Sequence, residues 1–596
     1  MISGVEPRQW RLRYESPCEL VETLKRETGL PELVIKVCIA RGLQTSEAIH
    51  GFLNPRFDSL TNPMTIKDMD RAVERLIAAR RTGELVRVFA DYDVDGTAGA
   101  ALLSWVFKEY GIKFDVRQPD RFKDGYGLNV GAVEEALAEN VSVMLTVDCG
   151  ISSFAAAAAA TKQSLDLIIV DHHQIDPERG LPEALAVVNP QRDDCPSGLK
   201  QICGCGLAFY LAMALRMRGR QEGWFRPGLE PNLKKHLDLV VIATAADMVP
   251  LTGDNHVLVR HGLEVLRRSM KPGVQSLLDA AGLNRDNLSP SHLGFVIGPR
   301  INASGRMKSA STAFELLSTE DILRARELAR ELEKLNVERA EFQNRIWDEV
   351  RLLVEREISA GGFQHAVVVA GNSWHEGVIG IVAARVCETF HRPAIVIAMK
   401  GDIGKGSVRT YGGKDVFSAL RSCSDLLLGF GGHKHAAGLS ISVKAVPAFT
   451  EAFDSAIVCA TNDGDVDSLL IEDECSIADF SLETLGELEK LGPFGQGNPE
   501  PVFAFRAGIS NHHVLKGRHV KMSFNDRGDH GDQIDAIWFN AAERHDVKDF
   551  FASFSSSSFS SGAGGFAQWA GVPELNRFRG KTVPTVRIKD WKRTSL

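Results

Sequence analysis

Short apolar runs alternate with helix-like segments between residues 85 and 250. The runs cover residues 85–90, 141–147, 167–170 and 186–188, and the helix-like segments cover residues 97–110, 132–139 and 154–161. Because these runs are continuous in apolar character rather than alternating, they predict strands that are buried on both faces of a sheet. Such a pattern is typical of a parallel sheet covered by helices, whose ligands collect at the carboxyl ends of the strands.

Residues 318–358 show a single long amphipathic pattern. Apolar residues recur there at every third or fourth position, which predicts one helix with one apolar stripe. Ser318 is a suitable N-cap, and Glu320 and Asp321 would lie in the first turn. At ~1.5 Å per residue, about forty residues form a rod of about 60 Å. Since Gly361-Gly362 follows, we expect this helix to connect two domains rather than to form a coiled-coil dimer.

Two further regions follow the long helix. Strands at residues 366–370 and 394–398, around a helix at 378–390, predict a second α/β unit. From residue 461 the pattern changes to short strands with turn signals, at residues 501–505, 520–524 and 535–539 and around Val586 and Ile588, which predicts a small β-barrel. A Ser/Phe/Gly tract at residues 550–566 predicts a flexible loop within that barrel, and its effect on the barrel stays open.

Length and composition agree with several ordinary globular domains. At about 150 residues per domain, a chain of 596 residues holds three or four. Hydrophobic residues make up 44% and charged residues 24% of the chain. The net charge of −8 means that any basic groove for nucleic acid must be local. We expect an N-terminal extension (1–50), a parallel-sheet catalytic domain (51–317), the connecting helix (318–360), a second α/β domain (361–460) and the barrel (461–596).

The cysteine content favours a reducing compartment. The ten cysteines include no CxxC pair, so they are expected to be reduced thiols rather than a disulfide framework. Residues 1–14 lack the apolar core of a signal peptide, and no window approaches ~18 uninterrupted apolar residues. These features predict a cytoplasmic protein without a membrane span.

The most informative chemistry directly follows the first apolar run, in the acidic sequence Asp91-Tyr-Asp93-Val-Asp95-Gly. Side chains at every second position of an extended segment point the same way, so three carboxylates would converge. Their mutual repulsion is costly unless a cation lies among them. Hard oxygen ligands favour Mg²⁺ or Mn²⁺, and the motif therefore predicts a metal-dependent enzyme.

Three more segments supply ligand-type side chains. Asp148 follows the second run, Asp171-His172-His173 follow the third, and Asp247 follows another apolar stretch at residues 237–242. Alone, an Asp at the end of a strand is most often a cap or a turn former, and a His–His pair is usually a surface feature. Because successive strands of a parallel sheet end at the same edge, the combination predicts one metal site.

In this order the motifs resemble those of the DHH phosphoesterase superfamily. The segment from Gly431 to Gly438, GGHKHAAG, resembles the signature of its companion DHHA1 domain. The segments GPRINASGRM, from Gly298, and WHEGVIG, from Trp374, are similar to those of the RecJ family of single-strand-specific DNA exonucleases. The resemblance extends from about residue 40 to the C-terminus.

The resemblance implies a two-metal site that holds Mn²⁺ or Mg²⁺, an arrangement that hydrolyses phosphodiester bonds. Many superfamily members have a histidine four residues before Asp93, where this chain has Phe89. Phe89 cannot bind a metal, so either one ion binds more weakly or Asp91 takes over. The implied ligands, which are also implied catalytic residues, are Asp93, Asp95, Asp148, His172 and Asp247, with Asp91, Asp171 and His173 as ligands or close neighbours.

Other implied residues belong to the substrate side. Arg306 is the candidate cation beside the scissile phosphate, with a structural salt bridge as its alternative. His433 is the candidate for a transition-state contact. Ser407 and Arg409 resemble the segment that grips a 5′-terminal phosphate, with a surface turn as the alternative. The remaining implied substrate-binding residues are Asn302, Gly431, Gly432, Lys516 and Arg518.

The barrel resembles an OB-fold that binds single strands. Aromatic side chains at Trp538, Phe539, Phe578 and Trp591 are candidate stacking platforms, of which we expect one or two to touch bases. Basic residues would bind the phosphate backbone without sequence preference. They are Lys516, Arg518, Lys521, Arg577, Arg579, Lys581, Arg587, Lys589, Lys592 and Arg593.

Together these features predict a metal-dependent 5′→3′ exonuclease that degrades single-stranded DNA to mononucleotides in recombination and repair. One alternative is a superfamily enzyme that degrades short oligoribonucleotides or cyclic dinucleotides, which has no need of a strand-binding barrel. The other is a catalytically inactive replication scaffold, which has no need of five intact ligands. The expected partners are single-stranded DNA with a 5′ end, a helicase and a single-strand-binding protein, and the expected state is a monomer without membrane contact.

Overall fold

The computed structural model describes residues 9–121, 123–226, 228–460, 468–525, 532–543, 547, 567–578 and 580–593. The Ser/Phe/Gly tract at 550–566 and Arg579 lie outside the described residues. The chain forms two compact units. One comprises Met1–Leu60, Pro250–Arg260 and Asp467–Leu596, and the other comprises Thr61–Val249 and His261–Val466. In the described part of the chain, no helix combines the length and the apolar character needed to cross a membrane.

The larger unit begins with the predicted parallel sheet. Its strand order is β3-β2-β4-β5-β6, and all four pairings are parallel. Every residue of β2 and β4 is buried, including Arg87 and Thr146, which explains why their sequences are otherwise apolar. The strands are β2 (Val86–Ala90), β3 (Phe114–Arg117), β4 (Val143–Val147), β5 (Asp166–Val170) and β6 (Ala186–Val188).

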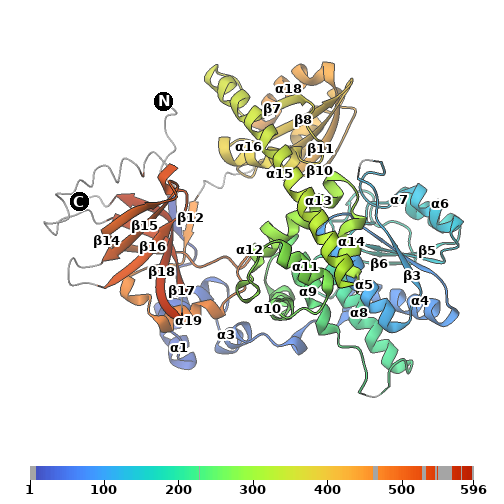
Figure 1. Ribbon diagram of the computed structural model, residues 1–596, viewed down its shortest axis with the longest axis horizontal. Helices are drawn as coiled ribbons and strands as arrows, with labels where there is room; N and C mark the ends of the chain where they lie inside the picture. The colour runs from blue at the N-terminus through green and yellow to red at the C-terminus, as the bar shows by residue number, and fades with distance from the viewer. Residues whose placement is uncertain are drawn as a thin grey trace. The chain divides into compact units, whose positions relative to one another are not determined.

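Helices cover both faces of this sheet, as the sequence predicted (Figure 1). On one face, the small side chains of α6 and α7 pack around Phe89, Met144 and Ile169. On the other face, α5 and α8 pack against each other and against β2 and β4. The helices on the two faces are α4 (Met69–Thr82), α5 (Val94–Tyr110), α6 (Val130–Ala138), α7 (Phe154–Lys162) and α8 (Gly204–Gln221).

A helical segment follows the sheet. The apolar stretch at residues 237–242 lies in helix α9. This helix packs against α5, and all of its residues from Leu237 to Ala245 are buried. The elements are α9 (Leu237–Ala246), α10 (Gly253–Arg267), α11 (Pro272–Ala280), α12 (Pro290–His292), the π-helix η5 (Leu293–Ile297), α13 (Gly298–Met307) and α14 (Ser311–Ser318).

The long helix α15 (Ile322–Ser359) begins four residues later than predicted. Ser318 is not its N-cap but the last residue of α14, where its hydroxyl donates to the Phe314 carbonyl. Asp321 caps α15 instead, because its side chain accepts from the N–H groups of Leu323 and Arg324. The helix contacts α11, α13 and α14 and then β7 and α16, so it links the two parts of this unit (Figure 1).

The second α/β part contains a mixed sheet in the order β10-β11-β9-β8-β7. Helices α15 and α16 cover one face, and α17 and α18 cover the other. Strands β9, β10 and β11 were not predicted, because glycines interrupt their apolar pattern. The elements are β7 (Val367–Asn372), α16 (Ile379–Phe390), β8 (Ala394–Lys400), β9 (Ile403–Arg409), α17 (Val416–Ser422), β10 (Gly429–His433), β11 (Ala436–Ser442) and α18 (Val446–Cys459).

The other unit contains the predicted barrel. Strands follow the order β13-β14-β15-β16-β18-β17, and the pairing of β14 with β17 closes the barrel. The strands predicted near residues 501–539 correspond to β14, β15 and β16, whereas β17 was not predicted. The strands are β13 (Asp473–Cys475), β14 (Phe503–Leu515), β15 (His519–Asn525), β16 (Gln533–Trp538), β17 (Ala567–Phe578) and β18 (Lys581–Arg593).

The N-terminal helices share the hydrophobic core of this barrel. Val34 and Ile35 of α2 belong to the same buried cluster as Phe503 and Phe524. Strand β1 also pairs in parallel with β12. The elements are β1 (Gln9–Leu12), α1 (Cys18–Thr28), α2 (Glu32–Ala40), α3 (Ser46–Leu53), β12 (Ser468–Ile471) and α19 (Leu482–Lys490). Short 3₁₀ turns complete the chain at Phe57–Ser59, Pro63–Thr65, Leu233–His236, Arg285–Asn287, Ser424–Leu426, Val443–Ala445, Ile477–Asp479 and Ala541–Glu543.

Candidate metal centre and phosphate-binding residues

Three parallel strands end in the acidic residues of the candidate metal centre. Asp91 follows β2, Asp148 follows β4 and Asp171 follows β5. The chain passes from β2 to β3 in one direction and places β4, β5 and β6 on the other side of β2. Open parallel sheets bind their ligands where the strand order reverses in this way. The fold therefore gathers these side chains at the edge where a ligand site is expected.

Asp93 fixes the start of helix α5. Its Oδ1 accepts from the backbone N–H groups of Asp95, at 2.9 Å, and of Gly96, at 3.2 Å. This N-cap turns the chain sharply after β2. As a result Asp91, Asp93 and Asp148 each offer a ligand atom, and the three atoms lie within 4.8 Å of one another.

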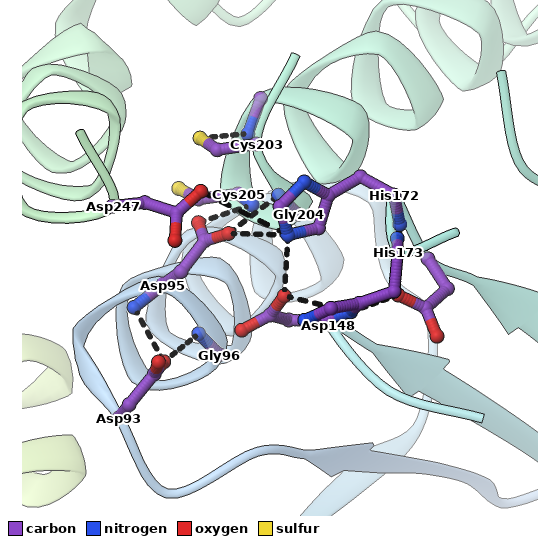
Figure 2. A network of polar contacts seen from close by, with 12 residues as sticks. Asp93, Asp95, Gly96, Asp148, His172, His173, Cys203, Gly204, Cys205 and Asp247 are labelled. Carbon is purple, nitrogen blue, oxygen red and sulfur yellow. Dashed lines mark hydrogen bonds and ion pairs between the residues drawn. The ribbon is translucent and has the colours of Figure 1, made fainter. Parts of the chain in front are cut away.

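Asp95 is held by the N-terminus of helix α8. Its two oxygens accept from the backbone N–H groups of Gly204, at 2.6 Å, and of Cys205, at 2.8 Å (Figure 2). This approach requires glycine at 204, because a Cβ there would lie 2.6 Å from the Cβ of Asp148. The positive end of the helix dipole helps to hold this carboxylate, which is only 1% exposed.

The imidazole of His172 faces three carboxylates (Figure 2). Its Nε2 lies 3.0 Å from Asp148 Oδ1, 3.7 Å from Asp95 Oδ2 and 3.8 Å from Asp247 Oδ2. Asp247 directly follows α9 and so reaches the site from the helical layer. Asp95, His172 and Asp247 form a second group whose ligand atoms all lie within 4.8 Å of one another.

Asp171 positions its neighbours rather than facing the cluster. Its carboxylate accepts from the backbone N–H groups of Ile151, at 2.9 Å, and His172, at 2.8 Å. It also lies 2.7 Å from Nδ1 of His173. A carboxylate that bonds one nitrogen of a histidine ring fixes the orientation of the other. The ring of His173 joins Asp148 and His172 in a third group of ligand atoms.

The electrostatics of the cluster favour a bound cation. Burial, and then the charges of Asp95 and Asp93, raise the pKa of Asp148 far above its usual range. The same causes raise the pKa of Asp247 to about 8. Burial also lowers the pKa of His172, which favours the neutral, metal-binding form of the ring. A divalent cation among these groups would remove the repulsion that raises the carboxylate pKa values.

Several buried ligand atoms also lack a hydrogen-bond partner. Among the described residues, Asp91 Oδ1 accepts no hydrogen bond, and His172 Nε2 and Asp148 Oδ1, although 3.0 Å apart, do not have the geometry of one. Buried polar atoms are rarely left unpaired. Since the donor set consists of carboxylate oxygens and imidazole nitrogens, it fits Mn²⁺ or Mg²⁺.

Position 89 contributes nothing to this cluster. The Phe89 side chain is 3% exposed and packs in the core beneath α6 and α7. Of the two alternatives for the missing histidine, the structure favours the one in which Asp91 supplies a ligand, because Asp91 is grouped with Asp93 and Asp148.

Arg306 lies among other guanidinium groups. Its Nη1 donates to the Gly377 carbonyl at 3.0 Å. Burial, and then the charges of Arg121, Arg339 and Arg409, lower its pKa to about 10. In the described part of the chain Arg306 forms no salt bridge, so the alternative of a structural ion pair is not supported. Clustered cations of this kind suit a phosphate.

The sequence did not single out Arg121 or Arg339. Arg121 precedes a glycine-rich turn at residues 125–127, and a guanidinium beside such a turn is a usable signal for phosphate binding. Arg339 belongs to the charged pattern of α15, in which it cannot be told apart from a solvated residue.

Ser407 and Arg409 lie together on β9 beside the first turn of α16. Arg409 Nη1 donates to Ser407 Oγ at 3.1 Å. A Cβ at Gly380 would lie 2.9 Å from Ser407 Oγ and 3.1 Å from Arg409 Nη2. The pair therefore lies against the N-terminal turn of a helix, a place that favours phosphate.

His433 ends strand β10 and is exposed. Gly432 before it has a φ of 139°, and a Cβ there would lie 2.5 Å from the Ala436 carbonyl oxygen. Gly431 has no atom within 4 Å of the place where its Cβ would lie, so its backbone is accessible. Burial, and then the charges of His435, Arg409 and His173, lower the pKa of His433.

Asn302 has a structural contact. Its Oδ1 accepts from the Val94 N–H at 3.1 Å, at the start of α5. Two residues near the site were missed by the sequence analysis. Gln118 donates to the Asp91 carbonyl at 2.8 Å, and the Tyr126 hydroxyl donates to the Asp148 carbonyl at 3.4 Å. Neither belongs to a motif that spacing alone would reveal.

In the barrel unit, Lys516 and Arg518 lie in the turn between β14 and β15. Of the four candidate aromatic platforms, Trp538 is 3% exposed and Trp591 packs against the core, whereas Phe539 is 50% and Phe578 is 66% exposed. Ion pairs between described residues hold Lys521, Arg577 and Arg587, which reduces the charge that these three offer to DNA. The pairs are Lys521–Asp535 at 3.0 Å, Arg577–Glu489 at 2.6 Å and Arg587–Glu500 at 2.6 Å.

Three family models match the chain. The DHH family N-terminal domain matches residues 85–244, the DHHA1 domain residues 362–458 and the RecJ OB domain residues 471–590. These matches agree with the predicted fold class.

Similar proteins cover most of the chain. The single-stranded-DNA-specific exonuclease RecJ of Salmonella typhimurium is 35% identical over 90% of this chain and 92% of its own length. The RecJ of Bacillus subtilis is 34% identical over 88% of this chain, and the chain spans 65% of that protein. A crystal structure of RecJ from Thermus thermophilus in complex with Mn²⁺ matches 99% of this chain and 80% of that chain, with a TM-score of 0.81 and 28% identity.

Proposed function

The chain belongs to the RecJ family of single-stranded-DNA-specific exonucleases, and from this premise we propose that it is a metal-dependent 5′→3′ exonuclease. It would hydrolyse single-stranded DNA to mononucleotides in DNA recombination and repair. The observation that carries the proposal is the convergence of five carboxylates and two imidazoles in three overlapping groups of ligand atoms.

The resident ions would be two Mn²⁺ or Mg²⁺. Related RecJ proteins from Thermus thermophilus have been crystallised with each of these metals. Asp91, Asp93 and Asp148 would hold one ion, and Asp95, His172 and Asp247 the other, with Asp148 and His173 close to both groups. When bound, two divalent ions activate water and stabilise the charge on the attacking and leaving oxygens of the phosphodiester.

The chain's own residues would place the DNA. Arg306 would bind the scissile phosphate. Burial strengthens its attraction for an anion, and among the described residues it forms no salt bridge that would compete with the phosphate. Ser407 and Arg409 would bind the 5′-terminal phosphate with a hydroxyl and a guanidinium fork. His433 would contact the phosphate that is cleaved, supported by the open backbone of Gly431.

The barrel would hold the rest of the strand. Lys516 and Arg518 would contact backbone phosphates, and Phe539 and Phe578 offer exposed rings for stacking. The proposed domain division is an extension at 1–50, a DHH domain at 51–317, a connecting helix at 318–360, a DHHA1 domain at 361–460 and the OB domain at 461–596. We further propose a monomer in the cytoplasm that acts with a helicase and a single-strand-binding protein.

End-labelled single-stranded DNA tests this function. The strand carries its label at the 5′ or the 3′ end and is incubated with Mn²⁺ and either the wild type, Asp93→Ala or the surface control Asp425→Ala. We expect the 5′ label to appear at once as mononucleotide with the wild type and the control, but not with D93A.

The two alternatives give different results. If long strands survive while fragments of two to five nucleotides disappear, the enzyme acts on small substrates. If the wild type hydrolyses neither substrate and Mn²⁺ calorimetry detects no site, the protein is a scaffold.

A further inference from the structure

A basic cavity lies in the second α/β part of the larger unit, outside the residues assigned to DNA cleavage. Its volume is about 510 Å³, which is in the range of small-molecule sites. It lies where β7 and β8 begin and where α16 ends. The lining residues that matter here are His365, His391, Arg392, Tyr411, Gly412 and Lys414.

The charge of this cavity is not compensated locally. No aspartate or glutamate lines it. Within the described residues, neither Arg392 nor Lys414 takes part in an ion pair. The Asp454 carboxylate, which is near the rim, accepts from the backbone N–H groups of His365 and Ala366. In a chain with a net charge of −8, a cavity with only basic and neutral side chains favours an anion.

Main-chain carbonyls hold both cations in the wall. Arg392 Nε donates to the Gln364 carbonyl and Nη1 to the Phe390 carbonyl, each at 3.2 Å. Among the described residues, Nη2 of Arg392 has no acceptor. Lys414 Nζ lies 3.4 Å from the Ile457 carbonyl. The cations are therefore oriented in advance, which reduces the entropy lost when a ligand binds.

The lining also offers an aromatic ring and accessible backbone. The Tyr411 hydroxyl lies 2.6 Å from His391 Nδ1, and the two ring centroids are 5.2 Å apart. Gly412 and Gly413 adopt φ values of 64° and 71°, and no atom lies within 4 Å of the place where either Cβ would be. Such glycines let backbone N–H groups approach a phosphate, and a fixed tyrosine ring can stack on a base.

We propose that this cavity is a second nucleotide site, which binds a free nucleoside 5′-monophosphate. Arg392 and Lys414 would bind the phosphate, and Tyr411 would stack on the base. The polar ends of the Ser407 and Arg409 side chains lie against Gly380 in the first turn of α16, whereas His391 follows the last turn of this twelve-residue helix. The Arg409 carbonyl lies 3.3 Å from Cys387 Sγ, near that last turn, so the two sites are separate but adjacent. The choice of ligand rests on the proposed function, since mononucleotides are the products that such a nuclease releases.

Calorimetry with deoxyadenosine 5′-monophosphate tests the site on the full chain. The titration is made in EDTA, so that the metal centre does not take part. We expect Lys414→Ala and Tyr411→Ala each to weaken binding at least tenfold. Lys444→Ala, an exposed lysine of the same domain, should bind as the wild type does. Arg409→Ala should keep the binding that depends on Lys414 and Tyr411. Inorganic phosphate should bind at least tenfold more weakly than the nucleotide.

Other outcomes overturn the inference. Unchanged affinity in both K414A and Y411A would exclude this cavity, and loss of binding in R409A alone would place the nucleotide at the cleavage site. Phosphate that binds as tightly as the nucleotide would exclude recognition of the base.

Hydrolysis of single-stranded DNA by the same preparations separates this inference from the proposed function. K414A should keep the wild-type rate, which also shows that it folds. Hydrolysis without nucleotide binding refutes only the second site. Nucleotide binding that depends on Lys414, without hydrolysis, refutes only the nuclease.

Discussion

At the scale of single residues, Asp91 lies where it can replace the histidine that position 89 lacks. It is 3% exposed and belongs to a ligand group with Asp93 and Asp148. We expect Asp91→Asn to weaken Mn²⁺ binding about tenfold to hundredfold, because an amide oxygen carries no charge to offset the cation. Calorimetry with Mn²⁺ measures this, with the exposed Asp425→Asn as control. Equal affinities of D91N and wild type would show that one ion binds without Asp91.

The proposed role of Arg409 is to bind the 5′-terminal phosphate of the substrate. We expect Arg409→Ala to reduce the preference for 5′-phosphorylated over 5′-hydroxyl strands about tenfold to hundredfold, since charge-assisted hydrogen bonds to a phosphate are lost. Arg409→Lys, which keeps the charge but not the fork, should lose part of the preference. The measurement is the ratio of kcat/KM for the two strand types, and a ratio unchanged in R409A would contradict the assignment.

His256 makes the barrel unit sensitive to acid. It stacks on Phe52 with ring centroids 4.1 Å apart, and its Nε2 lies 3.1 Å from the Phe52 carbonyl oxygen. Burial lowers its pKa from 6.5 to about 4, and the charges of Arg260 and Arg41 act in the same direction. The unfolded chain therefore takes up this proton first as the pH falls.

The stability that neutral His256 provides is constant above pH 6.5 and is lost as the pH falls from 6.5 towards 4. A shift of this size corresponds to about 3 kcal/mol over that window. His256→Phe keeps the stacked ring and removes the titration. We expect its free energy of unfolding to fall less steeply with acid than that of the wild type. The free energy of unfolding of both proteins is measured by denaturant titration across this pH range. If it falls equally with acid in H256F and the wild type, the assignment to His256 is contradicted.

At the scale of elements, α15 joins the metal-binding part of the larger unit to the part that carries Arg409. Val337 lies near its middle and is 47% exposed. We expect Val337→Pro to destabilise the unit by ~3 kcal/mol, because proline removes a hydrogen bond and kinks the helix. Val337→Ala should be nearly neutral.

The activity of this variant tests what the helix does. Metal binding should survive in V337P at a temperature where the unit stays folded, whereas hydrolysis of 5′-phosphorylated DNA should fall. Equal loss of Mn²⁺ binding and of hydrolysis would show instead that the kink disturbs the metal centre itself.

The elements also show what a sequence can and cannot predict. Strands β2, β4 and β5 were predicted within two residues, because strands buried on both faces have largely apolar sequences. Strand β3 was not, since it lies at the edge of the sheet and carries Asp115, which pairs with the buried Arg87 at 2.6 Å. Arg339 was not found as a candidate site residue, because only its position in space, near Arg306, distinguishes it from the other charged residues of α15. Asp148 and His172 were found, because they follow predicted strands.

At the scale of the whole molecule, packing between distant segments was hidden from the sequence. Helices α1 to α3 share one core with strands more than four hundred residues later, such as β14. An amphipathic pattern shows that a face is buried, but not against what. The N-terminal extension is therefore a structural part of the barrel unit.

The negative charge of the metal centre affects the stability of the folded protein. The chain carries a net charge of −8, and its buried carboxylate cluster adds repulsion that only the folded state experiences. A cation that binds the folded state stabilises it by about 2.7 kcal/mol at a hundredfold excess over Kd. We therefore expect Mn²⁺ to raise the unfolding temperature of the wild type, and EDTA to reverse the rise.

Asp148→Asn separates this effect from nonspecific binding of ions. The substitution removes a ligand that contributes to two of the three groups, so Mn²⁺ should no longer raise the unfolding temperature. In EDTA, D148N should be as stable as the wild type or more stable, because one buried charge and its repulsion are gone. Scanning calorimetry of both proteins with and without Mn²⁺ measures the difference. If D148N is strongly destabilised in EDTA, hydrogen bonding rather than charge repulsion dominates this cluster in the metal-free protein.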